Sequence, residues 1–165
     1  MRRAAAACFG LAIAFGAVGE ERSASEAIAE YRQMLEDGNP AELMELRGEE
    51  LWTTPLGPKN ASLAQCDLGL GPGVVEGAYA QLPRYFADTD RVQDAESRLL
   101  TCVTTLQGVP GDEAARGWYR AGSDLEALVT YLATQSRGKP IAAPVTHPKE
   151  AAFLAIGADL FYRRS

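Results

Sequence analysis

The sequence contains no Cys-x-x-Cys-His motif, only one histidine (His147) and only three cysteines. Attachment of haem c uses two thiols and an imidazole in that motif, so the usual covalent haem is excluded. A closed zinc site needs four ligands, which one histidine and the two cysteines beyond residue 19 do not supply. His147 precedes Pro148 and is interpreted as a helix cap or surface residue rather than an iron ligand.

Long apolar runs are equally scarce, and the one that stands out lies at the N-terminus. Residues 1–19 combine a positive start, Met1-Arg2-Arg3, an apolar stretch over 4–16 and the small-x-small sequence Ala17-Val18-Gly19. This order is typical of a signal peptide cleaved near Gly19 and predicts export, most simply to a periplasm. A buried N-terminal helix is the alternative. Beyond residue 19 no apolar run approaches the roughly 18 residues of a membrane span.

Positive charge is in short supply. The chain has 165 residues, with 16 basic and 22 acidic side chains, and removal of Arg2 and Arg3 with the leader leaves a net charge of −8. Nucleic-acid binding needs a basic face, so this balance argues against it. The same balance allows a soluble partner with a basic patch. The length suits one domain with a sizeable core.

Helical periodicity appears in five segments. A first helix should begin at the N-cap Ser25 and end at Gly38. A second should begin at Asn39-Pro40, with Leu43, Leu46 and, as a further candidate, Leu51 on its apolar stripe. Further helices are expected over 92–107, over 123–138 and from 147 onward. The 123–138 helix should begin with a capping box. The last should carry an apolar side made of Phe153, Ile156, Leu160 and Phe161.

The helix expected over 92–107 places four apolar residues on one face, which should point Cys102 inward: Ala95, Leu99, Cys102 and Leu106. Between the helices, 108–122 and 139–146 are interpreted as connectors. Residues 74–86 should form one or two helical turns with buried aromatic side chains at Tyr79, Tyr85 and Phe86.

Residues 53–73 contain seven glycines and prolines, a density that forbids a long helix or a central strand. A long structured loop in a small domain is usually functional or accompanies a ligand that has been lost. This loop holds the sequence Leu63-Ala64-Gln65-Cys66-Asp67. It has the spacing of a haem-attachment motif, but Leu63 stands where the first thiol would be and Asp67 where the imidazole would be.

Three strings around this frame resemble SoxA, the larger cytochrome subunit of the SoxAX complex of bacterial thiosulfate oxidation. They are Gly-Pro-Lys-Asn-Ala-Ser-Leu at 57–63, Cys-Asp-Leu-Gly-Leu-Gly-Pro-Gly at 66–73 and Gly-Ala-Tyr-Ala-Gln-Leu-Pro-Arg-Tyr-Phe at 77–86. Residues 117–132 fit the same family. The resemblance implies a mostly α, cytochrome c-like domain with a long Gly/Pro-rich loop. It also implies that Tyr79, Tyr85 and Phe86 could line space that a haem occupies in relatives.

The resemblance also implies a domain layout: a signal peptide at 1–19, a haem-less cytochrome c-like domain at 20–145, and the start of a second cytochrome-like domain at 146–165. In the family that second domain carries haem c, a persulfide cysteine and the reaction centre. No catalytic, cofactor-binding or metal-ligating residue can therefore be assigned here, and no cofactor is expected on this chain. Some members lack a haem in the first domain, and the frame at 63–67 groups this chain with them.

In such a member, Cys66 and Cys102 are expected to form a structural disulfide in an oxidising compartment, with two free thiols as the alternative. The resemblance implies a subunit of L-cysteine S-thiosulfotransferase, which joins thiosulfate to a cysteine of a carrier protein. It implies a small cytochrome partner, SoxX, and a sulfur-carrier protein, with this chain inactive by itself. A non-catalytic periplasmic interaction module is the alternative.

Overall fold

The computed structural model describes residues 23–37, 39, 41–118 and 120–164, and it divides the chain into two compact units, 1–39 and 40–165. The predicted leader and the helix end at Gly38 lie outside the described residues, as does Pro40. The first unit contains α1 (Ala24–Asp37). Ser23 caps this helix, because its hydroxyl accepts from Glu26 N while its own N–H donates to the Glu26 carboxylate. The predicted cap, Ser25, is wrong by two residues.

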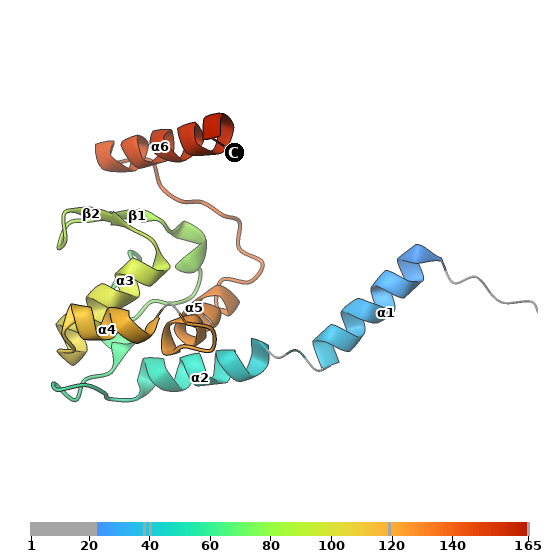
Figure 1. Ribbon diagram of the computed structural model, residues 1–165, viewed down its shortest axis with the longest axis horizontal. Helices are drawn as coiled ribbons and strands as arrows, with labels where there is room; N and C mark the ends of the chain where they lie inside the picture. Colours follow the sequence, from blue (N-terminus) through green and yellow to red (C-terminus); the bar gives the residue numbers. More distant parts are fainter. Residues whose placement is uncertain (1–22, 38, 40, 119, 165) are drawn as a thin grey trace, which may run out of the picture. The chain divides into compact units, whose positions relative to one another are not determined.

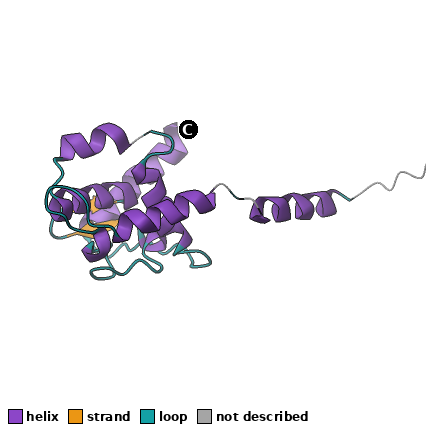
Figure 2. Ribbon diagram, turned by 90° about the horizontal axis from the view of Figure 1, so that it is seen from below, coloured by secondary structure: helices purple, strands orange, loops and turns teal. Residues whose placement is uncertain are grey.

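The second unit is mostly helical, as the fold-class prediction states, with a single two-stranded hairpin among the described residues (Figure 2). Its elements follow the order α2 (Ala41–Thr53), η1 (Leu63–Gln65), η2 (Tyr79–Gln81), β1 (Arg84–Phe86), β2 (Arg91–Gln93), α3 (Ala95–Cys102), η3 (Val103–Gln107), α4 (Gly111–Trp118), α5 (Asp124–Thr134) and α6 (Pro148–Arg164). No helix in the described part is long and apolar enough to cross a membrane.

Helices α2 and α5 form the main packing contact of this unit (Figure 1). Gly48 makes the close approach possible, because a Cβ there would lie 2.1 Å from the Ala127 carbonyl oxygen. Trp52 completes the contact and meets Tyr131 with ring centroids 6.3 Å apart. The predicted stripe on α2 is therefore wrong at Leu43 and Leu46, which are exposed, while Leu51 is partly buried against the core. The residues that α2 buries are Gly48 and Trp52.

Helix α3 begins later than the sequence pattern indicated. Asp94 accepts from Ser97 N and forms a capping box, while Val92 pairs with Tyr85 in the antiparallel hairpin β1–β2. The predicted inner face is confirmed, since Ala95, Leu99 and Cys102 are buried. The helix continues through the π-helical segment η3 and ends at Gly108, whose φ of 76° is the left-handed conformation that glycine favours.

The connectors are partly as expected. Residues 54–73 form a loop with a short helical turn, η1, and two isolated bridges, and 140–146 have no regular secondary structure. The predicted connector at 108–122 instead contains α4. Helix α5 begins at the predicted cap, since Ser123 accepts from Glu126 N. It ends at Thr134, four residues before the predicted end.

The buried core contains side chains from the loop over 54–73 and from the helices packed against it. Its largest fully buried side chains are Leu63, Cys66, Leu68, Leu99 and Leu132. Phe86 is buried as predicted, but Tyr79 is 39% exposed, so the expectation that all three aromatic residues are internal is wrong. The C-terminal helix α6 contacts β1 and β2, and its apolar residues remain exposed, among them Phe153 (51%) and Phe161 (68%).

Candidate functional site

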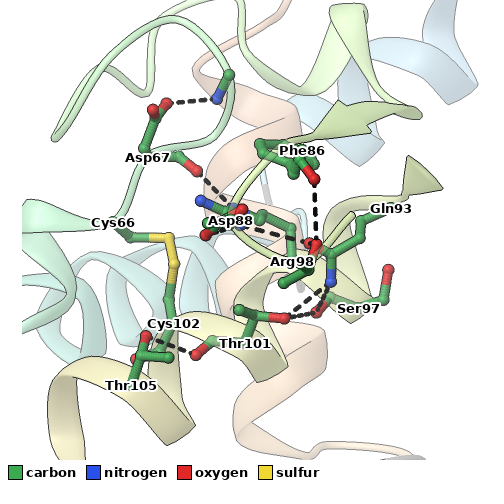
Figure 3. Close-up of polar contacts among 12 residues, drawn as sticks. Cys66, Asp67, Phe86, Asp88, Gln93, Ser97, Arg98, Thr101, Cys102 and Thr105 are labelled. Atoms are coloured by element: carbon green, nitrogen blue, oxygen red, sulfur yellow. Dashed lines mark hydrogen bonds and ion pairs between the residues drawn. A yellow bond between two sulfur atoms is a disulfide. The ribbon is translucent and has the colours of Figure 1, made fainter. Parts of the chain in front are cut away.

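The frame at 63–67 lies against the inner face of α3. Leu63 belongs to η1 and is 1% exposed, and Cys66 follows directly after that turn. The sulfur atoms of Cys66 and Cys102 form a disulfide (Figure 3), and the two Cα atoms are 5.6 Å apart, within the ordinary range of about 4.4–6.8 Å. The loop is therefore covalently joined to the last turn of α3.

Asp67 organises the loop that follows the disulfide. Its Oδ1 accepts hydrogen bonds from Gly69 N at 2.7 Å and Gly71 N at 3.0 Å. Both glycines have positive φ, 100° and 109°, which other residues adopt rarely. The carboxylate at the imidazole position therefore holds a tight turn through one of its oxygens.

Arg98 connects this turn to the hairpin, one helical turn before Cys102 (Figure 3). Its Nε donates to Asp67 O at 2.6 Å, and its Nη1 donates to both carboxylate oxygens of Asp88 at 2.9 and 2.7 Å. The guanidinium also lies 4.0 Å from the centre of the Phe86 ring. Arg98 is only 5% exposed. A buried charge is tolerated when it is paired and hydrogen-bonded in this way.

Sequence reasoning missed Arg98. The signal was present, because Arg98 and Cys102 are spaced i, i+4 and lie on neighbouring turns of the same helical face. A charged residue on a predicted inner face calls for a partner, and Asp88 supplies it from the turn between the two strands.

The residues of the frame do not fit haem c attachment. Leu63 is packed in the core, Cys66 is joined to Cys102, and Asp67 is bonded to two backbone amides. The family-implied haem would need thiols and an imidazole at these places. Among the described residues there is also no group of three His, Cys, Asp or Glu side chains arranged to hold a metal.

His147 lies at the start of α6, in agreement with its interpretation as a cap. Its ring stacks on Tyr85 with centroids 3.7 Å apart, and its Nδ1 accepts from Lys149 N. The Lys149 ammonium pairs with Asp90, which also accepts from the Tyr85 hydroxyl. These contacts raise the pKa of Tyr85, chiefly through the hydrogen bond to Asp90, and lower the pKa of Asp90, chiefly through the hydrogen bond from Lys149.

Glu150 attaches α6 to the hairpin. Its Oε1 accepts from Tyr85 N at 2.7 Å, and its Oε2 accepts from Thr146 N and His147 N at 2.8 and 2.9 Å. Burial alone would raise the pKa of Glu150, but these backbone donors, with the Thr146 hydroxyl, bring the pKa below the usual glutamate value. The carboxylate thus joins the helix start, the preceding connector and β1.

Comparison with known proteins identifies the class to which this fold belongs. The protein-family model described as "SoxA/TsdA, cytochrome c domain" matches residues 47–141 of this chain. The chain therefore belongs to the family of SoxA/TsdA cytochrome c domains.

Individual relatives agree with this placement. The "L-cysteine S-thiosulfotransferase subunit SoxA" of Hydrogenophilus thermoluteolus is 48% identical over 157 residues, which are 94% of this chain and 58% of that protein. A protein of the same name from Hydrogenobacter thermophilus is 28% identical over 151 residues, 90% of this chain and 56% of the relative. One from Paracoccus pantotrophus is 25% identical over 126 residues, 76% of this chain and 40% of the relative. The chain spans less than three fifths of these relatives' length.

Removal of the disulfide should destabilise the loop first. Closing a loop across a sequence separation of 36 residues restricts the unfolded chain by about 4 kcal/mol in the chain-entropy model. We expect the Cys102→Ser variant to have a markedly lower Tm and faster amide exchange over residues 60–75 before other parts of the domain. Intact mass after alkylation, with and without reductant, checks the crosslink itself. Two alkylated cysteines in unreduced, exported protein would refute it.

The attachment of α6 should weaken at low pH. The pKa of Glu150 is lower in the folded protein than in the unfolded chain, so its contribution is complete above the unfolded value of about 4.3. The contribution is lost as pH falls through the lower folded pKa. NMR signals of Tyr85 N–H and of the first turn of α6 should report this loss. Glu150→Gln should weaken the attachment of α6 already at neutral pH, and the same NMR signals should shift accordingly.

A matched control for this experiment is Asp159→Asn, which removes an exposed carboxylate from the same helix. It should leave the Tyr85 amide signal and its pH dependence unchanged. Equal effects of the two substitutions would show that general charge, rather than the Glu150 contacts, holds the helix start.

Proposed function

We propose that this chain is the supporting N-terminal part of a SoxA-type subunit of L-cysteine S-thiosulfotransferase, in the periplasmic oxidation of thiosulfate. The observation that carries the proposal is the 48% identity to the Hydrogenophilus thermoluteolus subunit across 94% of the chain. In the resembled family, the subunit joins thiosulfate to a cysteine of a sulfur-carrier protein. Haem c and the reacting cysteine belong there to a second domain.

The proposed layout is a leader at 1–19, a haem-less domain at 20–145 and the start of a second domain at 146–165. Two features support the second boundary. The family match ends at residue 141, and residues 142–146 have no regular secondary structure. Beyond them, α6 is held mainly by polar contacts at its first turn, and it exposes apolar residues that a further domain would cover: Phe153, Leu154, Ile156, Leu160 and Phe161.

The role that we propose for this part is mechanical. A rigid, crosslinked domain would hold the catalytic domain and present a docking surface to the small cytochrome partner, SoxX, and to the carrier protein. No described side chain is assigned a catalytic step. The chain by itself should therefore have no transferase activity.

A chimera tests this proposal. Residues 20–165 would replace the matching segment of the Hydrogenophilus thermoluteolus subunit, which would then be assembled with that organism's small cytochrome partner. We expect thiosulfate-dependent modification of the carrier cysteine at a rate within about tenfold of the parent, because domain positioning would be preserved. This chain alone should give only the background rate.

The matched variants use two arginines of this chain. Arg98→Met removes the hydrogen bonds to Asp67 O and to the Asp88 carboxylate, which is itself 55% exposed, so the loss should cost about 1–3 kcal/mol. That chimera should lose yield and thermal stability. Arg116→Met, at an arginine whose side chain is 74% exposed, should behave as the unmodified chimera. A well-folded but inactive chimera that no longer binds the small cytochrome would contradict the proposed role.

A further inference from the structure

Helix α6 carries an apolar stripe that stays at the surface of the second unit. The helix meets the rest of the unit chiefly at β1 and β2, beside its first turn (Figure 1). The stripe occupies roughly 160° of the helix circumference, at about 3.6 residues per turn. Its members are Phe153, Leu154, Ile156, Gly157, Leu160 and Phe161. The five large side chains among them are 49–68% exposed, so the hairpin leaves the stripe open.

The stripe is large enough for a stable contact. A fully buried aromatic side chain removes about 150–250 Å² from water, so five large side chains at this exposure offer roughly 500 Å². Two copies of the stripe would together bury roughly 1,000 Å², the size at which stable interfaces begin. Exposed apolar patches of several hundred Å² usually mark contact sites.

Gly157, at the centre of the stripe, indicates what kind of element covers it. Glycine is the least favourable residue in a helix interior apart from proline, so a packing reason for it is expected. In α2 that reason is visible, because Gly48 lets α5 approach to where a Cβ would lie 2.1 Å from Ala127 O. A Cβ on Gly157 would meet nothing within 4 Å. Gly157 thus suits a close helix crossing whose second helix lies outside the described residues.

We propose that the second helix is α6 of another copy of this chain, in an antiparallel pair that crosses at Gly157. A two-fold interface must be self-complementary, and the stripe has this property. Phe153 and Leu160 form one edge of the stripe, and Leu154 and Phe161 form the other, at equal distances in sequence from Gly157. In antiparallel order each phenylalanine therefore meets a leucine of the other copy.

The attachment of α6 favours the antiparallel direction. The hairpin adjoins the first turn of the helix, where Glu150 accepts from Tyr85 N and Lys149 pairs with Asp90. Antiparallel helices place the two hairpins at opposite ends of the pair, whereas parallel helices would bring both to the same end. Antiparallel order also sets opposite ends of the two helix dipoles beside each other. The inference does not rest on the proposed transferase role, although a following domain would compete for the same stripe.

Sedimentation equilibrium of the exported chain over a wide range of concentrations tests the pair. We expect a reversible equilibrium between monomer and dimer without larger species. Gly157→Leu should weaken dimerisation by at least about tenfold, because added bulk overpacks a close crossing. The substitution favours the helix itself, so circular dichroism should show a folded monomer. The matched control is Ala155→Leu, which adds similar apolar bulk on the opposite, exposed face of α6 and should leave the dimer unchanged.

Cross-linking tests the direction of the pair. When the Phe153→Cys and Leu160→Cys variants are mixed and oxidised, the mixed disulfide should exceed either self-disulfide. Self-disulfides in equal or greater yield, or no disulfide in protein that sediments as a dimer, would overturn the antiparallel arrangement. A chain that stays monomeric at every concentration would overturn the interface. So would a dimer that Gly157→Leu strengthens, because that is the response of unspecific apolar association.

Discussion

The covalent link between Cys66 and Cys102 is the constraint on which the domain depends. The loop over 54–73 has little regular structure to stabilise it. The disulfide fixes the loop to α3 at the place where the attachment frame lies. Leu63 and Leu68 on either side can then be completely buried. The frame at 63–67 is thus part of the core of this unit.

Besides the disulfide, two charged side chains join elements of this unit that are distant in the sequence. Arg98 joins the loop, α3 and the hairpin from inside the fold, while Glu150 joins the hairpin to α6. Because α6 is held by polar contacts at its first turn, its apolar residues stay at the surface. In the proposed subunit, that surface would meet the rest of the protein.

Sequence alone predicted those parts of the fold that depend on residues close together in the chain. Ser123, Gly108 and Pro148 mark helix ends as expected, and the spacing from Ala95 to Cys102 identified the buried face of α3. The sequence-based prediction failed where a contact with a distant segment determines which residues are buried. Gly48 faces inward because α5 approaches it, so Leu43 and Leu46 were placed on the wrong side of α2. The hairpin escaped notice because each strand has only three residues, and Val92 also fits a helical pattern.

The central claim is that the frame at 63–67 serves as a crosslinked structural segment and not as a haem site. The most direct measurement is the absorption spectrum of the full chain, exported from cells that also express a cytochrome c maturation system and a known c-type cytochrome as positive control. The account predicts a colourless protein with no pyridine haemochrome signal, because Leu63 and Asp67 supply neither thiol nor imidazole. A Soret band with a haemochrome signal from this purified chain would contradict it.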